Sequence, residues 1–308
     1  MKQHFLQSPA WEDYEHVEKH ETFRLDGDGF SAMAMLEYTV LGNYLFVPYG
    51  PTAENEKSFR KALDALRKLA KEQDAFFVRI EPTTPFPVAE LKTIGLTKSH
   101  NIDPAHTWVL DLTQPESQIF ADMEKEKGRL WRNCYKKDIT VRQTRNPEEV
   151  DILATMLDKV GSQNHFIPQK KIHLRRQMEA GFATLYVVEL KGESIAAALV
   201  YDYDDVRYYA HAAADYEHRK LAAGAILLVQ MIVDAKRAGM KTFDFWGITA
   251  SKNKNHPWYG FTEFKKSFGG KQVDYAGTWD LPVRKLRYYF YKIIRRVNRV
   301  RRKIWRRK

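Results

Sequence analysis

Cysteine is almost absent from this chain, which has one, Cys134, in 308 residues. A single thiol forms no internal disulfide and no cysteine metal cage, which excludes disulfide-stapled folds and favours a reducing compartment. The ten histidines include no HExxH motif and have no cysteine partners, so we expect no metal site. We interpret Cys134 as incidental rather than as a nucleophile.

Long apolar runs are also missing. No uninterrupted run approaches the roughly 20 residues that a membrane-spanning helix needs, and the start MKQHFLQSPAWEDYEH lacks the apolar core of a signal peptide. The hydrophobic share of 44% is nevertheless enough to fill the core of one large or two ordinary domains. We therefore expect a folded protein in the cytoplasm.

Acidic residues are missing from the C-terminal segment 284–308, which holds 13 Lys and Arg. The whole chain has 50 basic and 39 acidic residues, so its formal charge of +11 is concentrated at this end. The preceding residues carry 37 bases against the 39 acids and have a net charge of −2. The basicity therefore belongs to a tail rather than to the body of the protein.

The first third of the chain alternates between strand and helix patterns. Residues 31–50 predict two strands that meet at a turn at Gly42–Asn43. Residues 54–72 place apolar side chains at steps of three and four, which predicts an amphipathic helix, and the apolar run AFFVRI follows as a strand.

The remainder begins with a charged, helix-compatible run at 115–138 and a short strand DITVRQ. Helices are predicted at 148–160 and 169–180, then an antiparallel meander of FATLYVVEL, SIAAALVYDY and DVRYYAHAA. A helix at 219–237 ends at Gly239, and the strand TFDFWGI follows. Meander, helix, strand, helix and strand is the order of a GNAT-type acyltransferase domain.

Two segments carry a more specific likeness: RYYAHAAADYEHRKLAAGAILLVQMIVDAKRAGMKTFDFWGI and GFTEFKKSFGGKQVDYAGTWDLP. The second places an aromatic–Lys pair in the frame G-F-x-x-F-K-x-x-F-G-G, and FLQSPAW, VPYGP and VRIEP add to the likeness near the N-terminus. In these features the sequence resembles the Fem family of peptidoglycan bridge aminoacyltransferases over most of residues 5–282. It departs from some members by lacking a long helical hairpin arm and by carrying the basic tail.

The resemblance implies an α/β (α+β) chain of two GNAT-like subdomains with mixed sheets, which we place at 1–113 and 114–283. The tail at 284–308 is predicted from its own pattern to be a basic amphipathic helix. The resemblance further implies an aminoacyltransferase (EC 2.3.2 type) with the acceptor in a cleft and with neither coenzyme A nor a metal. The sequence supports the absence of coenzyme A, because Ala222 stands where R/Q-x-x-G-x-G/A has its first glycine, and its methyl group crowds the approach of a pyrophosphate.

The implied reaction is aminolysis of the aminoacyl-tRNA ester by an amine of the precursor stem peptide. An activated ester needs orientation and oxyanion donors rather than a covalent nucleophile. Within the family frame we assign Lys265 to oxyanion stabilisation or to holding a tRNA phosphate. A solvated helix lysine, as we expect of Lys266, is the alternative, and Phe264 is a pocket wall or core packing.

Other candidates follow from the predicted strands. Tyr209 and His211 are two apart on one strand, so we expect both on one face of the sheet, with Tyr209 donating to the stem peptide and His211 accepting a proton from the attacking ammonium. A satisfied core pair is the alternative. Asp244 and Trp246 end a strand, where functional residues gather, although Asp244 equally fits a role in pinning the next loop.

Binding residues for the two substrates are predicted less specifically. For an acceptor that carries a diphosphate, the basic and aromatic candidates are Trp11, Tyr49, Arg175 and Arg176, each with a structural or surface alternative. Arg129 and Arg132 resemble the family's basic helix, and we expect them to contact the tRNA backbone. A solvated helix face would show the same charges.

The tail combines charge with a narrow apolar seam at steps of four and three: Leu286, Phe290, Ile293, Val297, Val300 and Ile304. Uniform positive charge around such a seam predicts a helix lying on anionic lipid, with Arg295, Arg296 and Arg299 among its contacts and Tyr288, Tyr289, Tyr291 and Trp305 near the headgroups. A tRNA-binding arm is the alternative, and so is packing of its first half on the enzyme.

Together these features predict a monomeric, cytoplasmic transferase at the inner face of the cell membrane, active in cell wall biogenesis and cell shape. Its partners would be aminoacyl-tRNA, a lipid- or UDP-linked peptidoglycan precursor and the membrane. An acetyl-CoA-dependent GNAT N-acyltransferase, a tRNA-dependent transferase acting on protein N-termini and a non-catalytic adaptor remain alternatives.

Overall fold

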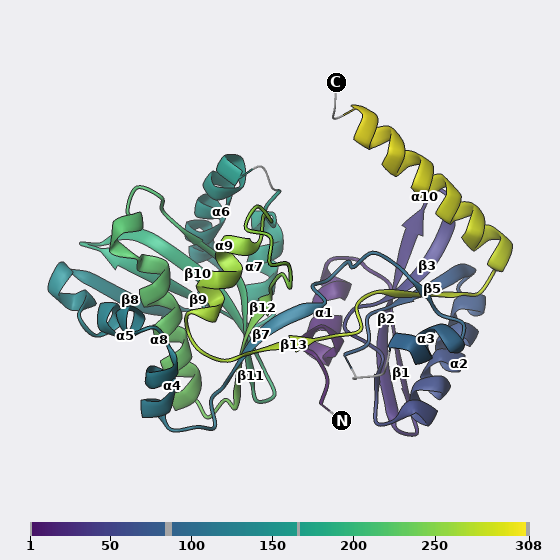
Figure 1. Cartoon of the computed structure of the whole chain (residues 1–308), viewed down its shortest axis with the longest axis horizontal. Helices are drawn as coiled ribbons and strands as arrows, with labels where there is room; N and C mark the ends of the chain where they lie inside the picture. Colours follow the sequence, from purple (N-terminus) through teal and green to yellow (C-terminus); the bar gives the residue numbers. More distant parts are fainter. Residues whose placement is uncertain (1, 84–87, 165–166, 306–308) are drawn as a thin grey trace. The chain divides into compact units, whose positions relative to one another are not determined.

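A computed structural model describes residues 2–83, 88–164 and 167–305 and divides the chain into two compact units (Figure 1). Unit 1 combines residues 1–105 with 275–308, and unit 2 is residues 106–274. The boundaries differ from the predicted ones after residues 113 and 283. The reason is that the segment after 275 returns to the first sheet, which the sequence pattern did not indicate.

Unit 1 is built on a mixed seven-stranded sheet in the order β1-β2-β3-β5-β14-β6, with β4 paired to β2. β3 and β5 are parallel, and β14 lies between β5 and β6. The strands are β1 Thr22–Gly27, β2 Phe30–Thr39, β3 Gly42–Val47, β4 Thr52–Ala53, β5 Ala75–Ile80, β6 Thr97–Lys98 and β14 Trp279–Pro282. The predicted hairpin is confirmed, because β2 and β3 pair antiparallel across Thr39 and Gly42.

Helix α2 (Glu56–Glu72) covers one face of this sheet and is the helix predicted at 54–72. Asn55 caps its N-terminus by accepting a hydrogen bond from the Ser58 amide. Its apolar stripe packs on the strands and forms the main core of unit 1. The smaller helices are η1 Phe5–Gln7, α1 Pro9–Val17 and α3 Val88–Thr93.

The tail helix α10 (Lys285–Trp305) begins as part of unit 1. Tyr288 and Tyr291 are buried against Phe76 and Phe77 of β5. β5 has one more residue than β3 between their paired positions, and this irregularity lets both phenylalanines reach the helix. The expectation that Tyr288 and Tyr291 lie near lipid headgroups is therefore wrong, because their rings belong to a protein core.

Unit 2 has a second seven-stranded mixed sheet in the order β13-β7-β12-β11-β10-β9-β8. The predicted meander is confirmed, since β9, β10 and β11 pair antiparallel in sequence order. The strands are β7 His106–Asp111, β8 Ile139–Thr144, β9 Ala183–Leu190, β10 Glu193–Tyr203, β11 Val206–Ala214, β12 Thr242–Gly247 and β13 Lys271–Asp274.

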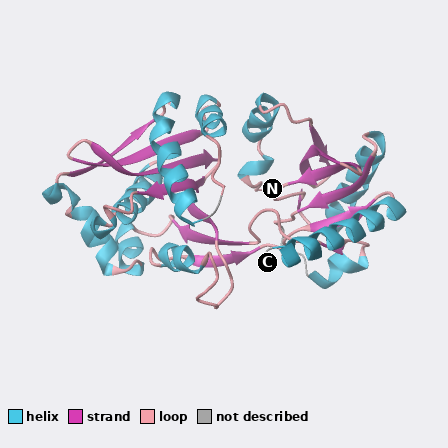
Figure 2. Cartoon of the chain, turned by 90° about the horizontal axis from the view of Figure 1, so that it is seen from above, coloured by secondary structure: helices cyan, strands magenta, loops and turns pink. Residues whose placement is uncertain are grey.

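Helices lie on both faces of this sheet (Figure 2). Helix α8 connects β11 to β12 and packs with β9 and β10 in the larger core, while α6 contacts β10 and β11. The helices are α4 Glu116–Asp122, α5 Lys125–Arg132, η2 Cys134–Lys137, η3 Pro147–Glu149, α6 Val150–Asn164, α7 Lys171–Glu179, η4 Arg219–Leu221, α8 Ala223–Arg237 and α9 Tyr259–Lys266. Two mixed sheets with helices confirm the predicted fold class. No helix among the described residues is both long and apolar enough to cross a membrane.

Candidate functional site

Two neighbouring strands of the second sheet separate part-way along their length. β11 and β12 run parallel and pair only over Val206–Tyr208 and Thr242–Asp244. Beyond these residues β11 continues along β10, and β12 pairs next with β7, where Gly247 lies opposite Thr107. The separation leaves the end of β12 accessible to a side chain from α9.

That side chain is Lys265, which is only 8% exposed. Its Nζ donates a hydrogen bond to the carbonyl oxygen of Gly247 at 2.7 Å. The ammonium also lies 4.8 Å from the ring centre of Phe261 and 5.9 Å from that of Tyr209. Burial lowers the pKa of Lys265 to about 7, with the nearby Asp244 opposing that shift. The solvated-lysine interpretation therefore does not fit Lys265.

Asp244 is the buried acid of this site, at 5% exposure. Burial raises its pKa to about 6, although hydrogen bonds and the charge of Lys265 favour its ionised form. Its carboxylate accepts hydrogen bonds from the Trp246 amide at 2.7 Å and from the Thr107 hydroxyl. Asp244 thus fixes the end of β12 to β7, whereas the pinning alternative concerned the loop after β12, and it also supplies negative charge near Lys265.

A β-bulge separates the two candidates on β11. Leu199 of β10 pairs with His211 and Val200 pairs with Tyr209, so Ala210 is an extra residue. Successive residues of β10 point to opposite faces, and cross-strand partners share a face. Tyr209 consequently joins the core beneath α8, while His211 lies on the other face. The expectation that both share a face is wrong.

His211 instead lies near Tyr201 and Trp246. The rings of His211 and Trp246 approach the Tyr201 ring at 6.2 and 6.1 Å, and Trp246 also contacts Tyr208 at 5.7 Å. Burial lowers the pKa of His211 to about 4, so its imidazole is neutral near pH 7. The structure therefore brings together Lys265, Tyr209 and Asp244, and separately His211 and Trp246.

Phe264 lies beside the N-terminus of α8. A methyl group built on Gly224 would lie 4.0 Å from Phe264 Cζ and 3.9 Å from Ala214 Cβ. Ala222, which precedes the helix, has a left-handed backbone with φ of 52° and no side chain caps this end. An aromatic ring therefore lies near the helix end at which GNAT enzymes bind pyrophosphate, and Phe264 packs partly on the core through Phe268.

This unit carries the family signature. Residues 186–296 match the sequence profile of the FemAB family, and the matched segment includes β11, α8, β12 and Lys265. Over this segment the chain is similar to the FemAB family. The resemblance drawn from the sequence is thereby confirmed. No curated protein sequence matches the chain.

Solved structures of similar fold cover most of the chain. The crystal structure of FemX superposes with a TM-score of 0.82 at 17% identity, covering 93% of this chain and 94% of FemX. L-PGS from Bacillus licheniformis gives 0.59 at 12% identity, covering 90% and 92%. A tandem GNAT protein from the clavulanic acid biosynthesis pathway gives 0.51 at 14%, covering 83% and 79%. At these identities the likeness is one of fold, and the predicted GNAT-like fold is confirmed.

The predicted tRNA contacts lie on an exposed basic surface of unit 2. Arg129 pairs with Glu126 at 2.9 Å, and Arg132 lies 5.3 Å from the ring centre of Phe120. Nearby, a hollow of about 290 Å³ combines basic and apolar side chains. It is lined by Arg129, Leu130, Asn133, Cys134, Lys136, Lys137, Leu221 and Ile226.

The predicted acceptor contacts do not gather into one group within either unit. In unit 2, Arg175 pairs with Glu148 and Asp151, and Arg176 is half-buried on the same helix. In unit 1, Trp11 packs on Phe5 and Tyr14. Tyr49 is buried, stacks on His4 and donates its hydroxyl to the carbonyl of Pro104. The structure thus gives Tyr49 and Trp11 packing contacts.

Two residues of the site were missed in the sequence. Thr107 and Gly247 contact Asp244 and Lys265, but Thr107 precedes Asp244 by 137 positions and Gly247 contributes only its carbonyl. Neither carries a local sequence signal, because a threonine in a strand and a glycine after one are common. Among the described residues, no three His, Cys, Asp or Glu side chains are grouped closely enough to hold a metal ion.

Proposed function

We propose that the chain is an aminoacyltransferase that moves an amino acid from aminoacyl-tRNA to an amine of a peptidoglycan precursor peptide. The match of residues 186–296 to the FemAB family and the fold shared with FemX and with a tandem GNAT protein support acyl transfer in general. The observation that carries the proposal is the buried Lys265 at the separation of β11 and β12, within the family segment.

Lys265 supplies the charge that the reaction needs. In aminolysis, the ester carbonyl oxygen becomes an oxyanion, and a donor fixed in a dry site stabilises it without reorganisation. The Lys265 ammonium is held by Gly247, and its charge is favoured by Asp244 and by the faces of Phe261 and Tyr209. We assign oxyanion stabilisation to Lys265 and a positioning role to Asp244.

His211 lies on the other face of the sheet, so we do not place it at the reacting centre. The reaction balances its protons without this histidine. The acceptor amine attacks as the free base, its nitrogen forms the amide bond, and the ester C–O bond breaks. The proton lost from nitrogen ends on the ribose oxygen that leaves. The ring of Tyr209 lies close to the Lys265 ammonium, so Tyr209 is the second group that we place near the reacting centre.

The proposed reaction uses neither coenzyme A nor a metal. Ala222 at the left-handed position and Phe264 beside Gly224 fill space at the end of α8, where a pyrophosphate would need bare backbone amides. A donor carried by tRNA makes no such demand. The exposed basic surface around Arg129, Arg132, Lys136 and Lys137 offers contacts for the tRNA backbone.

The tail helix would attach the enzyme to the inner face of the membrane. Leu286, Phe290, Ile293 and Val297 are 91%, 57%, 61% and 48% exposed, so the predicted seam is not the face that packs on unit 1. Cations flank this apolar face, which is the composition of an interfacial helix. Arg295 and Arg296 are exposed on this helix, and the side chain of Arg299 lies outside the described residues.

A direct assay tests the proposed function. The full chain is mixed with charged tRNAs and with nucleotide-linked and lipid-linked precursor peptides, and the peptide is weighed by mass spectrometry. We expect a gain of one aminoacyl group that requires the charged tRNA and disappears with deacylated tRNA. Transfer from acetyl-CoA in place of tRNA would instead establish the GNAT acetyltransferase alternative, and modification of a protein N-terminus would establish the other transferase.

A further inference from the structure

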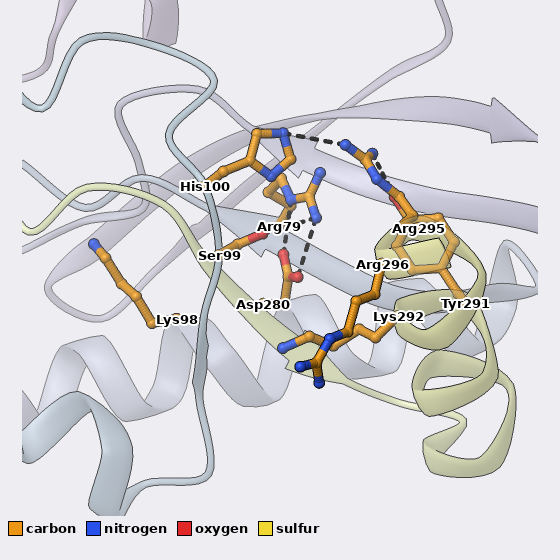
Figure 3. A pocket seen from close by; sticks show the side chains of 9 residues that line it. All are labelled: Arg79, Lys98, Ser99, His100, Asp280, Tyr291, Lys292, Arg295 and Arg296. Carbon is orange, nitrogen blue, oxygen red and sulfur yellow. Dashed lines mark hydrogen bonds and ion pairs between the residues drawn. The ribbon is translucent and has the colours of Figure 1, made fainter. Parts of the chain in front are cut away.

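Unit 1 contains a pocket of about 420 Å³ under the tail helix (Figure 3). Its walls come from β5, β6 and the residues after it, β14 and α10. We call it the arginine pocket, and its lining residues are Arg79, Lys98, Ser99, His100, Asp280, Tyr291, Lys292, Arg295 and Arg296. Five of these side chains are Lys or Arg and one is a carboxylate.

The single carboxylate is already neutralised. Asp280 and Arg79 are 1% and 3% exposed and form a two-pronged ion pair at 2.7 and 3.0 Å. The Tyr288 hydroxyl donates to the same carboxylate at 3.0 Å. Arg79 also donates to the hydroxyl of Ser99 at 3.1 Å. The floor of the arginine pocket is therefore a fixed, charge-balanced layer, and the cations above it are in excess.

The cations on α10 are oriented by neutral groups. Arg295 donates to the Tyr291 hydroxyl at 2.9 Å and to His100 Nε2 at 3.3 Å, which are dashed lines in Figure 3. Because the guanidinium is always protonated, His100 Nε2 is the acceptor in this contact. Over the described parts of the chain, no carboxylate pairs with Lys292, Arg295 or Arg296. Like charges held together without an acid favour a bound anion.

The chemistry of the cations selects the anion. Guanidinium forks match the oxygens of a phosphate group, and lysines add point charges. The volume exceeds that of a bare phosphate and lies in the range of sites for whole small ligands. Burial lowers the pKa of Lys98, which agrees with a cation held in a partly desolvated wall. The pocket therefore suits a phosphate that carries a further group.

The position of the pocket on α10 identifies what that group is. Residues step by about 100° around a helix, so Lys292 and Arg296 lie between the packed face of Tyr288 and Tyr291 and the exposed seam of Phe290 and Ile293. A phospholipid has an anionic phosphate and an apolar part, and both have a counterpart here. Neither a free phosphate nor an RNA backbone accounts for the seam.

We propose that the arginine pocket binds the phosphate group of an anionic phospholipid headgroup, with the seam of α10 in the acyl region of the same leaflet. The proposal rests on the proposed attachment of α10 to the membrane and adds a specific headgroup site to it. In non-specific attachment the binding free energy depends on the number of charges, so every basic residue on α10 contributes equally. A built pocket makes the contribution of a cation depend on its place in the pocket.

Vesicle binding by the full chain separates these two cases. The probes are vesicles of phosphatidylcholine with phosphatidic acid, and vesicles of phosphatidylcholine with cholesteryl hemisuccinate at equal surface charge, which present phosphate and carboxylate respectively. Arg296→Gln removes a pocket cation, and Lys285→Gln removes one exposed α10 cation outside the pocket. Both side chains are exposed, so both variants should fold.

On phosphatidic acid vesicles we expect Arg296→Gln to weaken binding by about 10-fold or more, as for a lost charge-assisted hydrogen bond, and Lys285→Gln by about 5-fold at most. On hemisuccinate vesicles the extra loss for Arg296→Gln should be smaller, because a carboxylate also pairs with guanidinium groups but has only two oxygens for the several cations of the pocket. Equal losses on both vesicle types would overturn the pocket and leave simple attachment. Failure of the wild type to bind either vesicle would overturn the lipid proposal, and an Arg296-dependent rise in melting temperature with inorganic phosphate or tRNA would then identify a soluble ligand.

Because binding is measured without turnover, the result is independent of the proposed transferase activity. A chain that binds phosphatidic acid vesicles through Arg296 but transfers no amino acid would keep the pocket and lose the function. The reverse outcome would keep the function and lose the pocket.

Discussion

The Nζ of Lys265 lies 2.7 Å from the carbonyl oxygen of Gly247, so one end of α9 is fixed to the end of β12 by a buried charge-assisted hydrogen bond. The carbonyl orients the ammonium but, being neutral, leaves its charge uncompensated. The negative charge of Asp244 raises the pKa of Lys265 and so partly opposes the effect of burial. This arrangement makes the protonation of Lys265 the variable on which several measurable properties depend.

The first prediction concerns the activity of Lys265 variants. Lys265→Met should reduce transfer by about 10²-fold or more, which is typical for the loss of one oxyanion donor. Lys266→Met is the matched control, because this neighbouring lysine pairs with Glu263 on the surface. Initial rates of peptide mass gain measure both variants. Near-normal turnover of a folded Lys265→Met protein would remove Lys265 from the mechanism.

The second prediction concerns the pH dependence of transfer. Burial lowers the pKa of Lys265 to about 7, so the ammonium is lost as pH rises through that value. If the ammonium is the active form, kcat/KM should rise with the free-base fraction of the acceptor amine only up to about pH 7 and then level off, because above it each gain in free amine is matched by a loss of ammonium. Lys265→Arg keeps its charge at all these pH values, so whatever activity it retains should keep rising up to the pKa of the acceptor amine. A wild-type rate that keeps rising through pH 7 would show that the ammonium is not the active form.

The third prediction concerns stability. Between pH 7 and 10.5 the folded chain binds fewer protons at Lys265 than the unfolded chain does, so this residue makes the free energy of unfolding rise with pH. Below pH 7 burial of the Lys265 ammonium lowers the free energy of unfolding by its full amount, on the order of 5 kcal/mol from the difference between a pKa of 10.5 and one of about 7. A methionine in its place would leave the Gly247 carbonyl without this donor, which costs roughly 1–3 kcal/mol.

Lys265→Met should therefore raise the free energy of unfolding by on the order of 1–3 kcal/mol at pH 6. The gain should shrink toward pH 10.5, and urea unfolding at several pH values measures it. A variant that is less stable than the wild type at pH 6 would show that the ammonium is favourably solvated in the fold.

A fourth prediction concerns coenzyme A. Neither coenzyme A nor acetyl-CoA should raise the melting temperature of the chain, because the Phe264 ring lies beside Gly224 and Ala222 adds a methyl group just before α8, where a pyrophosphate needs bare amides. Ala222→Gly relieves a left-handed alanine and should stabilise the fold by about 1 kcal/mol. It should still not bind coenzyme A, since Phe264 remains. A saturable shift with acetyl-CoA in either protein would restore the acetyltransferase alternative.

A fifth prediction separates the two faces of α10. Tyr288→Ala removes a fully buried ring from the contact with Phe77 and should cost about 3–5 kcal/mol of stability. Phe290→Ser, on the exposed seam, should change stability by less than about 0.5 kcal/mol. Vesicle binding should show the opposite order, with Phe290→Ser the weaker binder. Equal vesicle binding by Phe290→Ser and wild type would exclude the seam from membrane contact.

Much of the fold could be predicted from local pattern. The helix at Glu56–Glu72, the hairpin of β2 and β3 and the meander of β9 to β11 each follow from periodicity and turn residues in one contiguous stretch. The motif around Lys265 was recognised as a frame of residue types. The structure buries Lys265, and its role in the reaction stays a prediction.

The errors arise where two distant segments, or one inserted residue, decide the outcome. The face on which His211 lies depends on the single extra residue Ala210, and alternation read from the sequence assumes a regular strand. The packed face of α10 depends on Phe76 and Phe77 of β5, some 200 positions earlier. The sequence shows the apolar seam clearly, but Tyr288 and Tyr291 determine which face of the helix packs on the protein. No local signal marks β14 as a strand of the first sheet.

The place of β14 also sets the order in which the chain can fold during synthesis. β14 lies between β5 and β6, yet its residues follow the whole of unit 2. Until residues 279–282 leave the ribosome, β5 and β6 are neighbours without their shared partner and expose unpaired backbone groups. Unit 2 is contiguous and has no such dependence. The unit that emerges second can therefore complete its sheet first, and a nascent chain cut before β14 would keep the lysine site while leaving its N-terminal sheet open.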